Sequence, residues 1–324
     1  TIFSFKKNEK EVVHDSILKY NLLEKVYYWE EEPKSKLSRI KFVVNFLIRN
    51  KKAYTLTKVI KLLNPLKHGL KALSLHTFYK CQWFLKDNEF DVIHCHFAQT
   101  GMFISQLKRD GFLANEKLVT SFHGCDINPS KIEVYKKNYQ ILFKYIDLFT
   151  YNSTYSLNIL KKITNVNEKF KFLPVGLDTE LFSINNCRKS YSDKVNVLFC
   201  GRLVKFKAPN IAIEIVRDLL EKEYNVHLTI IGNGELEQQI ITQIKEFRLE
   251  SNVTLLGAVT QEKIISIMGN SDLFLLPGIE EEETGRAENQ GLVIQEAQSM
   301  QLPVIVSNAG GMKYGLLENK TGYV

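Results

Sequence analysis

The chain has 324 residues, which is long enough for two domains of ordinary size. Hydrophobic residues make up 44% and charged residues 24%, as in an ordinary globular protein, and no apolar run reaches the roughly 18 residues of a membrane-spanning helix. Five scattered cysteines show neither metal-site spacing nor a disulfide framework, and they favour a reducing cytosol.

The first part of the chain is strongly basic. Net charge is +7, yet 13 Lys and Arg and no acidic residue fall between Lys34 and Lys86. Helix-like apolar spacing occurs there in residues 42–48 and 59–63. A basic amphipathic segment can lie on anionic lipid, so we predict an anionic membrane surface as a partner. The alternative is a solvated helix face above an ordinary core. Aromatic residues do not alternate with the basic ones, so nucleic acid is not a predicted partner.

Short elements surround this basic segment. Residues 1–29 indicate a strand, a helix and a second strand, and Pro33 and Pro65 bound the basic helical region. Thr1 stands inside a pattern typical of a strand, and Val324 ends an incomplete strand–helix unit. We therefore expect a fragment that lacks its first strand, its first glycine loop and its last helices.

An apolar pattern over residues 91–97 predicts a strand that ends in polar residues. His94 and His96 alternate along it, so their side chains should point to the same side. We interpret them as packed or hydrogen-bonded histidines, because a metal site would need a third ligand.

A second strand, residues 118–122, is predicted to deliver His123, Gly124 and Asp126 to a loop at its carboxyl end. Histidine can donate or accept a proton near neutral pH, which makes His123 a candidate functional residue. Asp126 is a candidate cap for the helix that follows.

The second half alternates strands with helices, which is typical of a parallel doubly wound sheet. In such sheets ligands bind beyond the carboxyl ends of the strands. Arg202 and Lys207 follow the predicted strand 195–200, and Gly232 follows the predicted strand 226–231. Two basic residues directly after the carboxyl end of a strand are candidate functional residues, because arginine can engage an anion through two N–H groups and lysine as a point charge.

Two carboxylates mark the end of the chain. A buried strand over 273–276 leads through an acidic loop to Glu288, and the helix predicted over 291–300 contains Glu296. A carboxylate accepts hydrogen bonds from sugar hydroxyls, and a helix N-terminus suits phosphate. The remaining predicted elements are helices over 139–146, 154–160, 210–220 and 262–268, strands over 147–153, 169–175, 253–257 and 303–306, and a linker over 183–194.

The stretch from Leu276 to Gly311 resembles the Glu-x7-Glu signature of family 4 glycosyltransferases. Glu288 and Glu296 stand at its ends, and Asn289 is a departure where the family commonly has glycine. Further matches are Gly291, Ala297, Pro303-Val304, Gly310-Gly311, the Phe122-His-Gly-Cys-Asp126 loop and the Gly201-Arg-Leu…Lys207 element, with Ala208 in place of the usual glycine.

The resemblance implies a GT-B fold, an α/β architecture with two Rossmann-like parallel-sheet domains that face a cleft. The expected domains are residues 1–182 on the acceptor side and 183–324 on the nucleotide-sugar side. It also implies that Asp126 helps to hold its loop, so this role and helix capping both stay open. The His-Gly-Cys-Asp loop and the stretch from Thr284 to Gly291 are similar to bacterial transferases of exopolysaccharide and O-antigen assembly, of the colanic acid and amylovoran type.

By the same resemblance the chain is expected to be a retaining glycosyltransferase with a nucleotide-sugar donor. Arg202 and Lys207 would hold the diphosphate, Glu296 the ribose, Glu288 the donor sugar, and His123 would approach this sugar from the first domain. Gly232 would border the nucleotide, and backbone N–H groups near Gly291 and Gly310-Gly311 would add anion contacts.

The expected acceptor is a saccharide or lipid-linked saccharide at the cytoplasmic face of the membrane. No Asp-x-Asp motif occurs, so no divalent metal or other cofactor is predicted. Two alternatives stay open. One is a nucleotide-sugar epimerase on the same architecture, and the other is a non-catalytic basic module that binds membrane or nucleic acid.

Overall fold

The structure is a computed structural model that describes residues 2–4, 15–28, 33–49, 59, 62–64, 75–85, 90–113, 115–184 and 193–324. It divides into two compact units. The first comprises Thr1–Ile93 and Phe103–Lys117, and the second His94–Met102 and Leu118–Val324. Much of the basic segment, residues 1, 5–14 and 29 of the first pattern and most of the predicted linker over 183–194 lie outside the described residues.

The first unit contains a parallel pair of strands, in which Ile2 lies opposite Val26. Phe3 stacks on Trp83 with ring centroids 5.1 Å apart. The strand–helix–strand order predicted for residues 1–29 is confirmed within the described residues. The elements are β1 (Ile2–Ser4), α1 (Asp15–Lys19), η1 (Leu22–Lys25), β2 (Val26–Tyr28), α2 (Lys36–Arg49), α6 (His76–Cys81) and η2 (Gln82–Leu85).

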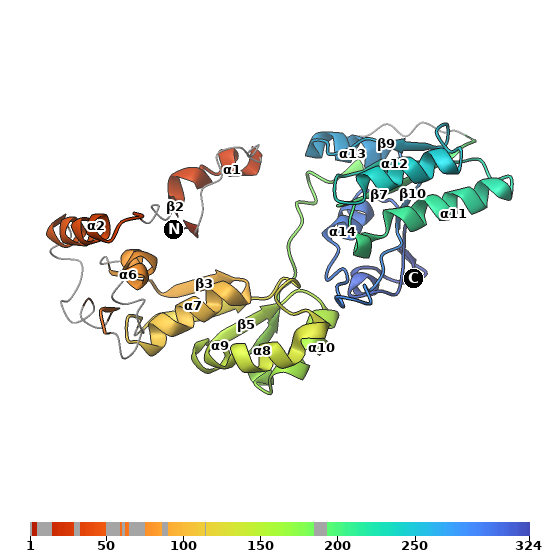
Figure 1. Cartoon of the computed structure of the whole chain (residues 1–324). Helices are drawn as coiled ribbons and strands as arrows, with labels where there is room; N and C mark the ends of the chain where they lie inside the picture. Colours follow the sequence, from red (N-terminus) through yellow and green to blue (C-terminus); the bar gives the residue numbers. More distant parts are fainter. Residues whose placement is uncertain are drawn as a thin grey trace. The chain divides into compact units, whose positions relative to one another are not determined.

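Helix α2 lies in the basic segment, and it forms where the apolar spacing over residues 42–48 predicts it (Figure 1). Val43 and Phe46 are buried along one side. Four other apolar side chains, spaced three or four residues apart, are exposed: Leu37, Ile40, Val44 and Ile48. The helix therefore has a core face and a second apolar stripe that the described residues do not bury.

Three elements have residues in both units: β3 (Val92–His96), α7 (Ala98–Arg109) and β4 (Lys117–Ser121). The strands β3 and β4 belong to a four-stranded sheet of order β3-β4-β5-β6, in which β4, β5 and β6 pair in parallel. The elements that follow in this half are η3 (Pro129–Lys131), α8 (Ile132–Asn138), α9 (Gln140–Tyr145), β5 (Leu148–Tyr151), α10 (Thr154–Ile163), η4 (Asn167–Lys169) and β6 (Phe170–Phe172). The helix α8 was not predicted; it follows the η3 turn, which begins at Pro129.

The second unit also contains a six-stranded sheet of order β12-β11-β10-β7-β8-β9. All neighbouring strands in this sheet are parallel. The predicted α/β class with parallel sheets is therefore confirmed. Its elements are β7 (Val195–Cys200), η6 (Lys205–Lys207), α11 (Pro209–Glu221), β8 (Val226–Ile231), α12 (Glu237–Glu246), β9 (Val253–Leu255), α13 (Gln261–Gly269), β10 (Leu273–Leu276), α14 (Leu292–Ser299), β11 (Val304–Val306), η7 (Met312–Gly315) and β12 (Gly322–Tyr323).

The central strands of this sheet are continuous apolar runs because helices cover the sheet (Figure 1). Phe199 of β7 and Phe274 of β10 are fully buried. Helix α11 contacts β8 and β10, and α14 contacts β11. Since β7, β10 and β11 are neighbours and parallel, the loops after them begin at one edge of the sheet. These loops carry most of the predicted site residues.

Candidate active site

An acid and a base that are far apart in the sequence meet at this edge. Lys207, in the η6 turn after β7, forms an ion pair with Glu288, in the loop after β10. Their side chains are only 12% and 16% exposed. The pair is therefore largely withdrawn from water. In such a site the Coulomb attraction between the two charges is much stronger than at an exposed surface. The sequence predicted both residues for one site, but not their direct contact.

Glu296 projects from α14 near the same lysine. Burial raises the pKa of the Glu296 carboxyl, and the charge of Lys207 opposes this shift. Gly291 is the N-cap of α14 with a positive φ of 67°, and a Cβ at this position would lie 2.8 Å from Ile294 Cδ1. The glycine thus lets the chain turn sharply from Glu288 into the helix.

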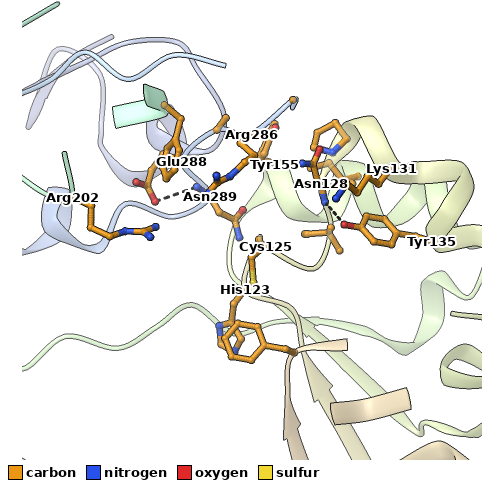
Figure 2. Close-up of a pocket in the computed structure, with 18 residues that line it drawn as sticks. His123, Cys125, Asn128, Lys131, Tyr135, Tyr155, Arg202, Arg286, Glu288 and Asn289 are labelled. Carbon is orange, nitrogen blue, oxygen red and sulfur yellow. Dashed lines mark hydrogen bonds between the residues drawn. The ribbon is translucent and has the colours of Figure 1, made fainter. Parts of the chain in front are cut away.

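A pocket of about 550 Å³ is lined by three of the predicted residues, His123, Arg202 and Glu288. Figure 2 shows these side chains with Arg286 and Asn289. The full lining consists of Phe97, His123, Gly124, Cys125, Ile127, Asn128, Pro129, Lys131, Tyr135, Tyr155, Ile159, Arg202, Phe206, Gly285, Arg286, Ala287, Glu288 and Asn289. Loops that follow strands of both sheets of the second unit therefore contribute to one pocket.

The other predicted ligands do not line this pocket. Lys207 reaches the pocket through its ion pair with Glu288, and its charge also acts on Glu296. Gly232 follows β8, where it has a φ of 136° and a Cβ would collide with the carbonyl of Gly201. Its N–H donates to the carbonyl of Gly257 at 2.9 Å. Gly232 therefore shapes the backbone next to Arg202.

One predicted group of anion donors needs correction. The Gly311 N–H donates to the Glu288 carbonyl at 2.7 Å, so it is already used within the protein. A Cβ at Gly310 would collide with this same carbonyl, and one at Gly311 would collide with the carbonyl of Asn289. The glycine pair lets the loop after β11 pack directly on the Glu288–Asn289 backbone, which fixes the backbone of the acidic residue.

His123 is the end of a row of three histidines. Its Nε2 lies 3.0 Å from Nδ1 of His96, and the two rings stack at 5.2 Å. His96 stacks in turn on His94 at 4.7 Å, and His94 Nε2 lies 2.6 Å from Ser121 Oγ. The prediction that both strand histidines point to the same side, packed and hydrogen-bonded, is confirmed.

The surroundings of His123 and His94 lower the pKa of both side chains. Burial lowers the pKa of His123, and the neighbouring His96 lowers it further, while Asp126 acts in the opposite direction. Burial also lowers the pKa of His94, with smaller contributions from His96 and His123. A neutral His123 can present either a donor or an acceptor to a ligand in the pocket.

Asp126 holds the His123 loop from inside. Its carboxylate is fully buried and accepts hydrogen bonds from the N–H groups of His123 and Gly124, each at 3.1 Å. It also accepts from Ala98 N at 2.9 Å, at the start of α7. Asp126 therefore holds the loop, and it caps a helix that precedes it in the chain. The following η3 turn is capped by Asn128, which accepts from Ser130 N at 2.9 Å.

Asn289 is a site residue whose contacts sequence reasoning missed. Its buried side-chain amide accepts from Ser153 Oγ at 2.8 Å and from Ser156 Oγ at 2.5 Å, and it donates to Asn152 Oδ1 at 2.7 Å. These three partners stand at the turn between β5 and α10, on the other sheet. Asn289 N also donates to Glu288 Oε1 at 3.3 Å. The signal in the sequence was Asn289 itself, where the family commonly has glycine.

Neighbouring residues of the same loop repeat this connection. The Gln290 side chain accepts from Val175 N at 2.9 Å and donates to Val175 O at 3.1 Å. Ser130 Oγ donates to the Thr284 carbonyl at 2.8 Å. A Cβ at Gly124, where φ is 110°, would lie 3.0 Å from Asn289 Cβ. The loop that carries Glu288 is thus attached at several points to the segments after β4, β5 and β6.

Two further observations concern the described residues as a whole. No helix among them combines the length and the apolar character that crossing a membrane requires. Nor do they bring together three histidine, cysteine or carboxylate side chains in a group suited to a metal ion. The absence of a metal requirement stays a prediction.

Comparisons with known proteins agree with these motifs. Residues 46–181 match the model of Glycosyltransferase Family 4, and residues 184–324 match that of Glycosyl transferases group 1. The chain is 25% identical over 324 residues to WcaL of Escherichia coli, a putative colanic acid biosynthesis glycosyltransferase, and covers 78% of it. It is 31% identical over 235 residues, 72% of the chain, to the amylovoran biosynthesis glycosyltransferase AmsK of Erwinia amylovora, and covers 57% of that protein.

Solved structures share the fold. The Anabaena protein HepE, crystallised with UDP and glucose, has a TM-score of 0.64 at 18% identity over 94% of this chain and 74% of HepE. A glycosyltransferase from Rickettsia africae has a TM-score of 0.62 at 17% identity over 95% of this chain and 73% of its own. With both family models matched in succession and the GT-B fold shared, the chain belongs to the family 4 (group 1) glycosyltransferases.

Proposed function

We propose that the protein transfers a sugar from a nucleotide-sugar donor to an acceptor hydroxyl with retention of the anomeric configuration. The observation that carries the proposal is the pocket in which His123, Arg202 and Glu288 meet. These residues come from three loops, and together they offer a neutral imidazole, a guanidinium and a carboxylate to one ligand. Such a set suits a sugar that carries a diphosphate leaving group.

Each residue has a distinct role in this proposal. Arg202 stabilises the diphosphate as charge accumulates on it. Glu288 accepts hydrogen bonds from the donor sugar, and Lys207, its ion-pair partner, orients this carboxylate. Glu296 binds the ribose hydroxyls, and His123 approaches the sugar from the first sheet.

The proposed reaction exchanges one bond at the anomeric carbon. The bond to the diphosphate oxygen breaks, and its electron pair stays on this oxygen. The acceptor oxygen bonds to the anomeric carbon, and its proton passes to the released diphosphate. Closing of the site around the donor would exclude water and limit hydrolysis.

The proposed process is the assembly of a bacterial surface polysaccharide, with a saccharide or lipid-linked saccharide as acceptor. The names of the two relatives, which refer to colanic acid and amylovoran biosynthesis, support this class of product. The donor nucleotide is an open choice within the proposal, because HepE was crystallised with UDP, whereas a 25% identical mannosyltransferase of Corynebacterium glutamicum is GDP-mannose-dependent.

Helix α2 supports a position at the cytoplasmic face of a membrane. Its stripe of Leu37, Ile40, Val44 and Ile48 is exposed, and the segment around it carries 13 basic residues without an acid. Apolar side chains between lysines suit an anionic lipid surface. In co-sedimentation with phosphatidylglycerol vesicles at low salt, the wild type should pellet, and a variant with serine at these four positions should pellet less. Equal amounts of both in the supernatant would remove the membrane from the proposal.

The central test combines binding with turnover. A thermal-shift screen against UDP-, GDP- and ADP-sugars identifies the donor, and transfer of radiolabelled sugar to a lipid extract measures activity. Glu288→Ala and Arg202→Ala should abolish transfer while the far-ultraviolet circular dichroism stays that of the wild type. Near-normal turnover in both variants would refute the roles assigned to them. Consumption of the donor without an acceptor, with an epimerised sugar as product, would favour an epimerase.

A further inference from the structure

Two arginines of the pocket lie against one aromatic ring. The guanidinium carbon of Arg286 is 5.2 Å from the centroid of the Phe206 ring, and that of Arg202 is 5.8 Å from it. Both arginines line the pocket (Figure 2). The Phe206 side chain is buried. An aromatic face holds a guanidinium by its plane, which leaves the N–H groups at its edge directed to other partners.

The backbone of Phe206 is tied to a neighbouring loop. Ile279 N donates to the Phe206 carbonyl at 2.9 Å, and a Cβ at Gly278 would lie 2.9 Å from this same oxygen. The turn that carries Phe206 is thereby tied to the start of the loop that carries Arg286. Since Arg202 stands only four residues before Phe206, one buried anchor sets the position of both guanidinium groups.

Two lysines close to the arginines have acidic partners, whereas neither arginine has one among the described residues. Lys207 pairs with Glu288, and Lys205 lies 3.5 Å from Glu283. Across the described residues, no carboxylate lies within ion-pair distance of Arg202 or Arg286. Two positive charges without a partner in the described protein therefore face the pocket from neighbouring loops of the six-stranded sheet.

The thiol of Cys125 is influenced by both arginine charges. Burial raises the pKa of the Cys125 thiol, and the charges of Arg286 and Arg202 both oppose this shift. Cys125 also lines the pocket. Both guanidinium groups are thus within electrostatic reach of one pocket residue, in agreement with their shared contact on Phe206.

We propose that Arg286 is a second phosphate-binding arginine, which grips the diphosphate of the nucleotide-sugar donor together with Arg202. The inference rests on the proposed function and extends it to a residue that the family signature does not include. Each guanidinium can donate two parallel N–H bonds to phosphate oxygens, and the pair stabilises the charge that collects there as the sugar leaves. The donor is favoured over an acidic acceptor because both arginines belong to the sheet that carries Glu288 and Glu296.

The test is isothermal titration of the full chain with UDP, GDP and ADP, followed by the same titration of variants with the nucleotide that binds. Arg286→Ala should weaken diphosphate binding roughly ten- to a hundredfold, as for the loss of a charged hydrogen-bonding group. Arg286→Lys should recover part of this loss, because lysine restores the charge but not the fork. Binding of the corresponding nucleoside, followed by saturation-transfer NMR, should not change.

Arg217→Ala is the matched control. Arg217 also stacks on a phenylalanine, with its guanidinium carbon 4.6 Å from the Phe247 centroid, but it pairs with Asp218 and does not line the pocket. Its removal should leave nucleotide affinity unchanged. Wild-type affinity in Arg286→Ala, or equal loss of nucleoside and diphosphate binding, would overturn the inference and leave the proposed function standing. A wild type that binds none of the three nucleotides would overturn both.

Discussion

Two loops border the pocket, and each depends on one buried polar side chain. The His123 loop is held by Asp126, whose partners are backbone N–H groups of its own loop and of α7. The Glu288 loop is held by Asn289, whose partners are side chains of the turn between β5 and α10. The first loop is thus secured within its own sheet, whereas the second is held both by Gly311 of its own sheet and by these side chains of the other sheet. This difference indicates that the position of Glu288 is coupled to the first sheet, whereas that of His123 is set locally.

The largest effect is expected for Asp126→Ala. This change leaves three N–H groups without their acceptor in a fully buried site, which should lower the free energy of unfolding by about 3 kcal/mol or more. Urea denaturation followed by circular dichroism measures it. Asp126→Asn should cost less because one acceptor oxygen stays. Asp218→Asn, at an exposed ion pair, is the control and should be nearly neutral.

An intermediate effect is expected for Asn289→Ala. Three side chains lose their common partner, so stability should fall by roughly 2 kcal/mol. If Asn289 couples the sheets, Ser156→Ala should cost much less in the Asn289→Ala background than in the wild type. A double-mutant cycle measures this difference. Additive costs would show that the two side chains act independently, and the contrast between the loops would then be lost.

The smallest effect concerns pH. The pKa of His123 is lowered in the folded protein, so the unfolded chain binds more protons below its ordinary pKa of about 6.5. This contribution to stability is fully present above that pH and is lost as the pH falls through the lower, folded value. The groups that face His123 are His96 and Asp126. The urea midpoint should therefore fall from pH 7.5 to pH 5.5, and it should fall less in His123→Asn. The same decrease in both proteins would contradict the prediction.

Regular patterns in the sequence were sufficient for the strands and most helices around the site. Buried parallel strands such as Leu273–Leu276 are continuous apolar runs, and Gly291 marks the start of α14. The Lys207–Glu288 ion pair could not be predicted from such patterns. The two residues are separated by 80 others, and their contact depends on the tertiary fold. Asn289 was equally hidden, since a single polar residue in a loop is usually solvated.

Ala208 shows how a departure from a family pattern can be explained only in three dimensions. It adopts the left-handed conformation, with φ of 51° and ψ of 52°, and it is fully buried at the start of α11. Glycine adopts this conformation without steric cost, which accounts for its usual presence at this position. The loop after Lys207 thus keeps the turn that glycine would make, although the sequence alone left its shape open.

The thiol of Cys125 offers a site for chemical labelling of the pocket. Of the four cysteines in the described part of the chain, Cys81, Cys95 and Cys200 are buried, and Cys125 is exposed. It lines the same cavity as Arg202 and Glu288. In a Cys187→Ser background, alkylation by a maleimide should thus be directed to the pocket wall, and a bound nucleotide sugar should slow it. The rate of labelling then measures occupancy of the pocket without any knowledge of the acceptor.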